Sequence, residues 1–148
     1  MIDRNIVFLD SNLNSKNTIL NFLISSLQDD DYLDRDAHDF KNKILKREKE
    51  VTTYMGNAIA IPHAKSSEVK RPFITFLRLK KPLEWNKGQK DTVSMIFMLG
   101  VPEKEGEVHL QVLSNLARKL ISKDILKKLE FTTDPEEVVQ ILDKEGDK

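Results

Sequence analysis

The sequence predicts a single α/β domain in which helices cover both sides of a small mixed β-sheet. Two observations lead to this prediction: apolar residues recur at helical spacing near both ends of the chain, and short apolar runs typical of strands lie between them. A third is composition, because 148 residues with 39% apolar and 32% charged side chains exclude collagen-like or wholly disordered chains. We therefore assign residues 1–148 to one domain, with a flexible charged tail over residues 143–148.

Two helices are expected before the first strand. The apolar face of the first is formed by Ile19, Leu20, Leu23, Ile24 and Leu27. The apolar face of the second is formed by Ala37, Phe40, Ile44 and Leu45. Asp34 precedes the second set and is a candidate N-cap, because its carboxylate can accept an unpaired backbone N–H of the first helical turn.

Three strands are expected in the middle of the chain, over residues 59–61, 73–79 and 93–99. The strands are indicated by branched and aromatic side chains, which favour extended backbone. Residues 93–99, VSMIFML, are apolar almost throughout, as is typical of a strand covered on both faces. This run is therefore predicted to be the central strand.

Three more helices are expected after the loop at residues 100–106. A long one is indicated by Val112, Leu113, Leu116, Ala117, Leu120 and Ile121. A shorter one is indicated by Ile125, Leu126 and Leu129. The last has a clear start, because Asp134 is a candidate N-cap, Pro135 suits the first helical position, and Glu136 and Glu137 favour the positive end of the helix dipole.

Composition also excludes several classes of function. The chain has no cysteine, which removes thiolate nucleophiles, zinc–cysteine sites and disulfide scaffolds, and fits a reducing cytoplasm. It has no signal peptide and no apolar run long enough to cross a membrane, so direct membrane insertion is not expected. Because 24 basic and 24 acidic side chains balance, nucleic-acid binding is not expected either.

His63 stands out among the three histidines because it follows directly on a predicted strand, in residues 59–65, IAIPHAK. The strand stops at Pro62, and strand ends are where side chains project into clefts. The small Ala64 leaves the backbone accessible for N–H donation to an anion. From this placement alone, both a functional histidine and a hydrogen-bonded structural one remain open.

Residues 48–64, EKEVTTYMGNAIAIPHA, resemble the active-site signature of the IIA domains of the sugar phosphotransferase system, mannitol/fructose type. The shared pattern is an acidic residue, six spacers, an apolar residue, glycine, two spacers, and an aliphatic-Ala-aliphatic-Pro-His-small run. Residues 102–120, which contain His109-Leu110, resemble the segment that carries the family's second histidine. The resemblance therefore covers nearly the whole chain and implies the fold of these domains.

Members of this family accept a phosphoryl group from the phosphocarrier protein HPr on a histidine and pass it to a cysteine on the IIB domain of a sugar permease. The resemblance implies that His63 is the phosphoryl acceptor. A neutral imidazole is nucleophilic near pH 7, and its phosphoramidate is reactive enough to be passed on. The resemblance thus implies a cytoplasmic phosphotransferase component with HPr and IIB as partners.

The resemblance also assigns roles to Arg47 and His109. Arg47 stands where the family keeps an arginine that meets the phosphoryl group, and its fork can bind two oxygens at once. Alternatively, Arg47 only complements the dipole at a helix C-terminus. His109 is implied to be the second active-site histidine, which stabilises the transferring group without carrying it. At a helix start the positive dipole end disfavours a charged imidazole, so His109 is expected to stay neutral.

Two departures from the family pattern affect the details. Ala64 replaces the glycine that most members place after the histidine, and its methyl group crowds the approaching phosphate slightly. The loop at residues 102–107, PEKEGE, is richer in charge than in many members, so its complementarity to HPr or IIB is expected to differ.

Two other functions stay open. In the first, the same phosphorylation of His63 switches the affinity of a regulatory module for a target protein, as in nitrogen-type or transcription-regulator-linked IIA domains. In the second, His63 and His109 are the base and acid of a hydrolase, although the sequence offers no carboxylate that orients either ring and no serine elbow. The sequence does not distinguish transport from regulation, nor does it indicate the sugar or the oligomeric state.

Other features are given structural interpretations. His38 is expected on the solvent side of the second helix, and Trp85 is expected to plug the core partly. Residues 29–31, DDD, are interpreted as a solvated turn, because they lack the glycine and closing glutamate of a calcium loop. The histidines lack ligand spacing and no glycine-rich nucleotide loop is present, so neither a metal nor a cofactor is expected.

Overall fold

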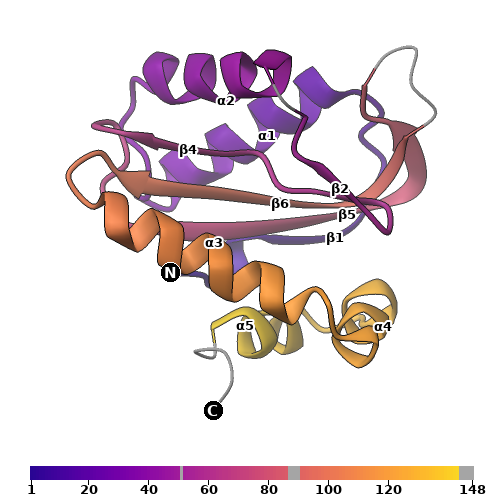
Figure 1. Cartoon of the computed structure of the whole chain (residues 1–148). Helices are drawn as coiled ribbons and strands as arrows, with labels where there is room; N and C mark the ends of the chain where they lie inside the picture. The colour runs from indigo at the N-terminus through magenta and orange to yellow at the C-terminus, as the bar shows by residue number, and fades with distance from the viewer. Residues whose placement is uncertain (51, 87–90, 144–148) are drawn as a thin grey trace.

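In the computed structural model, which describes residues 1–50, 52–86 and 91–143, one mixed sheet lies between two helical layers. Figure 1 shows α1 (Lys16–Asp29) and α2 (His38–Glu50) on one side of the sheet. The other side is covered by α3 (Gly106–Lys119), α4 (Lys123–Phe131) and α5 (Pro135–Asp143). The prediction of a single α/β domain with helices on both sides of a small mixed sheet is confirmed.

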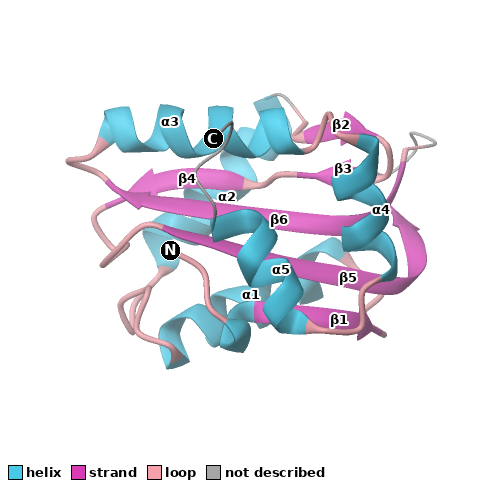
Figure 2. Cartoon of the chain, turned by 90° about the horizontal axis from the view of Figure 1, so that it is seen from below, coloured by secondary structure: helices cyan, strands magenta, loops and turns pink. Residues whose placement is uncertain are grey.

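The sheet is built around two long antiparallel strands, β5 (Phe73–Glu84) and β6 (Thr92–Pro102). Strand β1 (Val7–Ser11) runs parallel to β5 at one edge. On the other side, β3 (Ile59–Ala60) and β4 (His63–Ser66) pair in succession with β6, both in parallel. Strand β2 (Tyr54–Gly56) pairs with β3 in antiparallel and completes the sheet, as Figure 2 shows from below.

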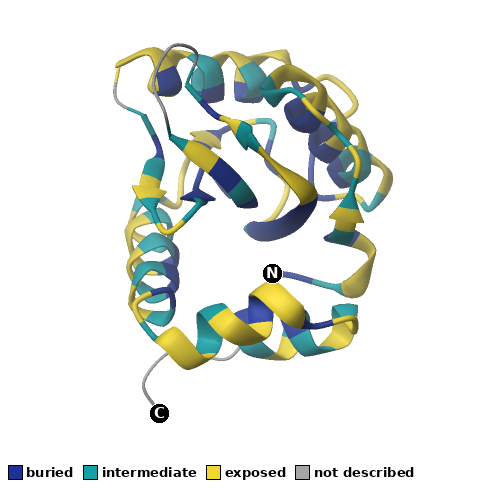
Figure 3. Cartoon of the chain, turned by 90° about the vertical axis from the view of Figure 1, so that its right-hand side faces the viewer, coloured by how far each residue is buried: buried dark blue, intermediate teal, exposed yellow. Residues whose placement is uncertain are grey.

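The predicted central strand is confirmed, because β6 has neighbours on both sides and its residues 95–101 are all buried. Figure 3 shows how burial follows the layers, with buried residues on the strands and on the helix faces that cover them. Gly100 of β6 lies against Phe73, and a Cβ atom there would approach the Phe73 ring to 2.4 Å. Only glycine fits this position without displacing the aromatic packing of Phe73 against Phe40.

The helix patterns are confirmed where the local signal is complete. All five apolar residues predicted for the first helix are buried in α1, and Ser15 caps the helix by accepting from the backbone N–H of Thr18. Asp134 caps α5 as predicted, because its Oδ1 accepts from the backbone N–H of Glu136 at 3.0 Å. Asp143, the first residue of the predicted tail, is the last residue of α5, and residues 144–148 lie outside the described residues.

The prediction of Asp34 as N-cap of the second helix is wrong. Helix α2 begins at His38, whose backbone N–H donates to Asp36 Oδ1 at 3.1 Å. The backbone N–H of Phe40 donates to Glu68 Oε1 at 2.7 Å. Because Glu68 is distant in the sequence, no local pattern reveals this cap.

Other boundaries also differ from the sequence-based expectations. The expectation of two helices before the first strand is wrong, because the chain enters the sheet as β1 before α1. Strands β2 and β4 were not predicted, because their residues, YMG and HAKS, lack the apolar run that indicates the strand at residues 59–61. The long late helix was predicted to include Leu120 and Ile121. Instead α3 ends at Lys119, and Ile121 is 77% exposed in the turn before α4.

No helix in the described part of the chain combines the length and the apolar character needed to cross a lipid bilayer.

Candidate functional site

His63 is the first residue of β4, at the point where the chain leaves β3 and pairs again with β6. Pro62 lies between the two strands, and its carbonyl oxygen accepts from the backbone N–H of Leu99 at 3.0 Å. His63 itself is in register with Leu99. The histidine therefore follows a strand as predicted, but it also begins another strand, whose pairing with β6 fixes its backbone.

The His63 ring is half-buried and has a defined orientation. Its Nδ1 lies 2.6 Å from the carbonyl oxygen of Ile61. A carbonyl oxygen can only accept a hydrogen bond, so Nδ1 carries the proton in the neutral ring. The lone pair of that ring is consequently on Nε2.

His109 lies beside His63 although the two residues are 46 positions apart in the sequence. It is in the first turn of α3, and its ring centroid is 5.4 Å from that of His63, with the ring planes nearly perpendicular at 89°. Burial lowers the pKa of His109 below its usual value of 6.5, and the nearby groups of His63, Lys65 and Arg47 lower it further. These effects favour the neutral ring at pH 7, in agreement with the expectation from the helix dipole.

Arg47 completes the group of three predicted residues. Its side chain and the two imidazoles line the same cleft, which has a volume of about 440 Å³. The full lining is Lys43, Arg47, His63, Ala64, Lys65, Glu103, His109, Leu110 and Leu113. Arg47 is exposed and makes no hydrogen bond or ion pair with any other described residue, so its guanidinium is available to an anion.

The cleft carries more positive charge than the sequence analysis anticipated. Lys43 forms ion pairs with Asp39 at 3.1 Å and with Glu103 at 3.7 Å. The Lys65 ammonium lies near Gly106, the first residue of α3, at the positive end of that helix. Cations and a helix start that converge on two imidazoles favour a phosphoryl group there.

Neither lysine was singled out from the sequence, although spacing gives a signal for both. Lys43 precedes Arg47 by one helical turn, and Lys65 is two residues beyond His63 on a strand. Each spacing places the lysine on the same face as its partner. Leu110, which is 70% exposed beside His109, was also not singled out.

The residues that were given structural interpretations lie outside the cleft. His38 is exposed at the start of α2, and Trp85 is a core residue with 2% exposure, as expected. In the Asp29–Asp31 turn, Asp31 pairs with Lys70 at 2.6 Å. Asp30 is half-buried rather than fully solvated, and a hydrogen bond with Asp3 raises its pKa to about 6. No group of three or more His, Asp or Glu side chains within the described ranges could hold a metal ion.

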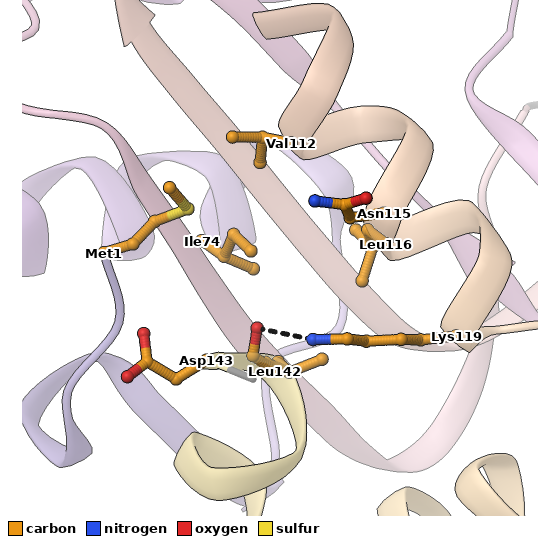
Figure 4. Close-up of a pocket in the computed structure, with 8 residues that line it drawn as sticks. All are labelled: Met1, Ile74, Val112, Asn115, Leu116, Lys119, Leu142 and Asp143. Atoms are coloured by element: carbon orange, nitrogen blue, oxygen red, sulfur yellow. Dashed lines mark hydrogen bonds between the residues drawn. The ribbon is translucent and has the colours of Figure 1, made fainter. Parts of the chain in front are cut away.

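A second cavity, of about 240 Å³, lies beside α3 between Met1 and the end of α5 (Figure 4). Ile74, Val112 and Leu116 line it, and Lys119 donates to the carbonyl oxygen of Leu142 at 3.0 Å at its edge. This contact ties the end of α5 to α3. The cavity contains no imidazole, and we interpret it as a packing feature that supports the helix carrying His109.

Comparison with known proteins places these residues in a family context. Residues 1–145 match the family model described as "Phosphoenolpyruvate-dependent sugar phosphotransferase system, EIIA 2". The chain is 33% identical over 109 residues to a PTS system fructose-like EIIA component of Escherichia coli K12, covering 74% of this chain and 73% of that protein. It is 32% identical over 141 residues to a multiphosphoryl transfer protein of Shigella flexneri, covering 94% of this chain but only 16% of that longer protein.

Solved structures agree with the sequence comparisons. The nitrogen regulatory protein IIA-Ntr from Neisseria meningitidis superposes with a TM-score of 0.83 at 31% identity, covering 95% of this chain and 94% of that one. The mannitol enzyme IIA of E. coli, in a complex with phosphorylated enzyme IIB, superposes with a TM-score of 0.79 at 21% identity, covering 97% of each chain. The second likeness is evidence of a shared fold.

Proposed function

Because the chain belongs to the EIIA 2 family of the phosphoenolpyruvate-dependent sugar phosphotransferase system, we propose that His63 accepts a phosphoryl group from the phosphohistidine of HPr and passes it to a cysteine of a IIB domain. The observation that carries this proposal is the convergence of His63, His109 and Arg47 on one cleft. The proposal implies a cytoplasmic protein, because its reaction depends on two cytoplasmic partners.

The first transfer forms one bond to phosphorus and breaks another. His63 Nε2 attacks the phosphorus held by the HPr histidine, the P–N bond to HPr breaks, and its electron pair returns to the HPr imidazole. The Nδ1 proton stays on the hydrogen bond to Ile61. This bond stabilises the positive charge that develops on the His63 ring as Nε2 is used.

The cleft stabilises the transferred group by charge and position. The unpaired Arg47 guanidinium can meet two of its oxygens, and Lys65 adds a second positive charge. A neutral His109 can donate one hydrogen bond to the group without repelling the attack on the neighbouring ring. In the second step a IIB thiolate attacks the phosphorus and the Nε2–P bond breaks.

The IIB partner is supported by the structural likeness to mannitol enzyme IIA, which is seen in a complex with its IIB. A regulatory role is the second candidate, supported by the likeness to the nitrogen regulatory protein IIA-Ntr at 31% identity. In that role the same phosphorylation would switch binding to a target protein, and no sugar would be moved.

The two candidates are tested with the purified chain, phosphoenolpyruvate, enzyme I and HPr. We expect a label that is acid-labile and alkali-stable, as a phosphohistidine is. Addition of candidate IIB domains and sugars should then discharge it. A chain that stays unlabelled contradicts the phosphocarrier role, and a labelled chain that no IIB discharges but that binds another protein favours regulation.

A further inference from the structure

The carboxylate of Glu48 is buried next to Arg47 on α2 but does not line the cleft. Its side chain is 4% exposed. Oε2 accepts from Lys16 Nζ at 3.1 Å and from Trp85 Nε1 at 3.2 Å, while the Thr53 hydroxyl donates to Oε1. One carboxylate therefore joins α1, α2, the segment after β5 and the segment before β2.

This arrangement costs free energy that an apolar contact would not. A buried charge loses its hydration, and here that loss falls on the Glu48 carboxylate, because the Lys16 side chain is still 24% exposed. Lys16 also lies 4.7 Å over the Trp85 ring, so its ammonium is held from two sides. Glu48, Lys16 and Trp85 therefore hold neighbouring segments of the chain in fixed positions, and one of these segments leads to His63.

From Thr53 a series of hydrogen bonds leads to the imidazole of His63. The carbonyl oxygen of Thr53 accepts from the backbone N–H of Ile61 at 3.1 Å. The carbonyl oxygen of Ile61 in turn accepts from His63 Nδ1 at 2.6 Å. The carbonyl that orients the imidazole thus belongs to a peptide segment whose position depends on Thr53, and Thr53 is held by Glu48.

The same carboxylate also holds the helical turn that carries Arg47. Arg47 directly precedes Glu48 near the end of α2, where a helix tends to fray because its last carbonyls lack partners. Anchoring Glu48 to Lys16 and Trp85 holds this last turn against α1 and the end of β5. The contacts of Glu48 therefore bear on the positions of both His63 and Arg47.

We propose that Glu48 is a positioning residue for phosphoryl transfer, which sets the orientation of the His63 imidazole through Thr53 and Ile61 and the place of Arg47 through the last turn of α2. This inference rests on the proposed function of His63. The inference can nevertheless be tested separately from that function, because the orientation of the His63 ring can be measured without any phosphoryl donor.

The test uses Glu48→Gln and Thr53→Val in the full chain, with Thr75→Val as the matched control. Thr75 is also a buried threonine whose hydroxyl donates a hydrogen bond, to the carbonyl oxygen of Ile6, but it is not part of the series of hydrogen bonds from Glu48 to His63. The first readout is the tautomer of His63 in unphosphorylated, ¹⁵N-histidine-labelled protein. The second is the rate of phosphorylation by HPr per folded molecule, separated into kcat and KM.

We expect the wild type and Thr75→Val to hold His63 as the Nδ1–H tautomer. Glu48→Gln and Thr53→Val should show a mixture of tautomers, with kcat lowered about 10- to 100-fold and KM for HPr unchanged, as for a misplaced reacting group. Wild-type tautomer and kcat in both variants would overturn the inference, as would an equal change in Thr75→Val. If Glu48→Gln does not fold, Thr53→Val decides alone. Failure of the proposed function gives a different result, an unlabelled wild type with an ordered His63.

Discussion

The cleft that holds His63 and the second cavity both lie beside α3, but they differ in whether a basic side chain is left without a bonding partner. In the cleft, Arg47 has no partner among the described residues, and the Nε2 lone pair of His63 points away from the hydrogen bond that holds its ring. In the second cavity, Lys119 is bonded to the Leu142 carbonyl and Asn115 accepts from Arg118. Both spaces are hollow, and an unpaired cation beside an imidazole with a free lone pair distinguishes the cleft as the candidate site.

The largest expected effect is that of His63→Ala, which should abolish labelling by HPr because the nucleophilic nitrogen is removed. Labelling is measured by acid-labile phosphate per folded molecule. His38→Ala is the control, because His38 is an exposed histidine on α2 outside the cleft, and it should label as the wild type does. Persistent labelling of His63→Ala would place the acceptor elsewhere.

Arg47→Ala should slow the transfer roughly 10²- to 10³-fold, the usual loss when a preorganised group that stabilises developing charge is removed. The rate is measured by labelling with phosphorylated HPr in a time course in which the reaction is quenched at successive times. Lys46→Ala is the matched control: Lys46 is the neighbouring exposed cation on the same helix and does not line the cleft. Equal rates in the two variants would reduce Arg47 to a residue that complements the helix dipole.

Lys65→Ala should raise the pKa of His109, because the Lys65 charge is one of the causes that lower it. The pKa should remain below 6.5, since burial is the largest cause and is unaffected. An NMR titration of the ring measures the change, and Lys80→Ala, an exposed lysine on β5, should leave the pKa where it is. A fall or no change would mean that Lys65 does not face the ring.

The same lowered pKa predicts how stability depends on pH. The unfolded chain binds the His109 proton more readily than the folded chain does, so stability is lost as pH falls from 6.5 through the folded-state pKa. The contribution is complete above pH 6.5. His109→Gln should flatten this part of the profile of thermal unfolding against pH, and an unchanged slope would contradict the lowered pKa.

The smallest effect is expected in the second cavity. Lys119→Ala removes the hydrogen bond to the Leu142 carbonyl and should lower the free energy of unfolding by about 1 kcal/mol. Denaturant unfolding measures this loss. The transfer rate per folded molecule should stay that of the wild type, and a rate loss comparable to that of Arg47→Ala would show that the second cavity belongs to the site.

The parts of the fold that could be predicted are those with local signals. The buried face of α1 and the cap at Asp134 depend on residues within a few positions of one another. The cap of α2 by Glu68 depends on a distant partner, and β2 and β4 lack an apolar run. Strand β1 does have such a run, residues 6–9, IVFL, which the sequence-based prediction did not use. The sequence predicts Asp34 as the cap of α2, whereas the first backbone N–H groups of this helix donate to Asp36 and to Glu68.

The candidate site shows the same limit. The motif and the family resemblance predict His63, His109 and Arg47 as site residues, but only the parallel pairing of β4 with β6, and the turn from β6 into α3, bring the two rings together. Glu48 was visible as the acidic residue that opens the motif. Its buried contacts were not visible, because its partners Lys16 and Trp85 are 32 and 37 positions away.

The most direct test of the central claim is to identify the atom that carries the phosphoryl group. Protein labelled with ¹⁵N-histidine is phosphorylated by HPr, and coupling between ³¹P and ¹⁵N identifies the bonded nitrogen. The hydrogen bond from Nδ1 to Ile61 predicts a single bond to Nε2 of His63. Phosphorus on Nδ1 of His63, on His109 or on a carboxylate would contradict the account.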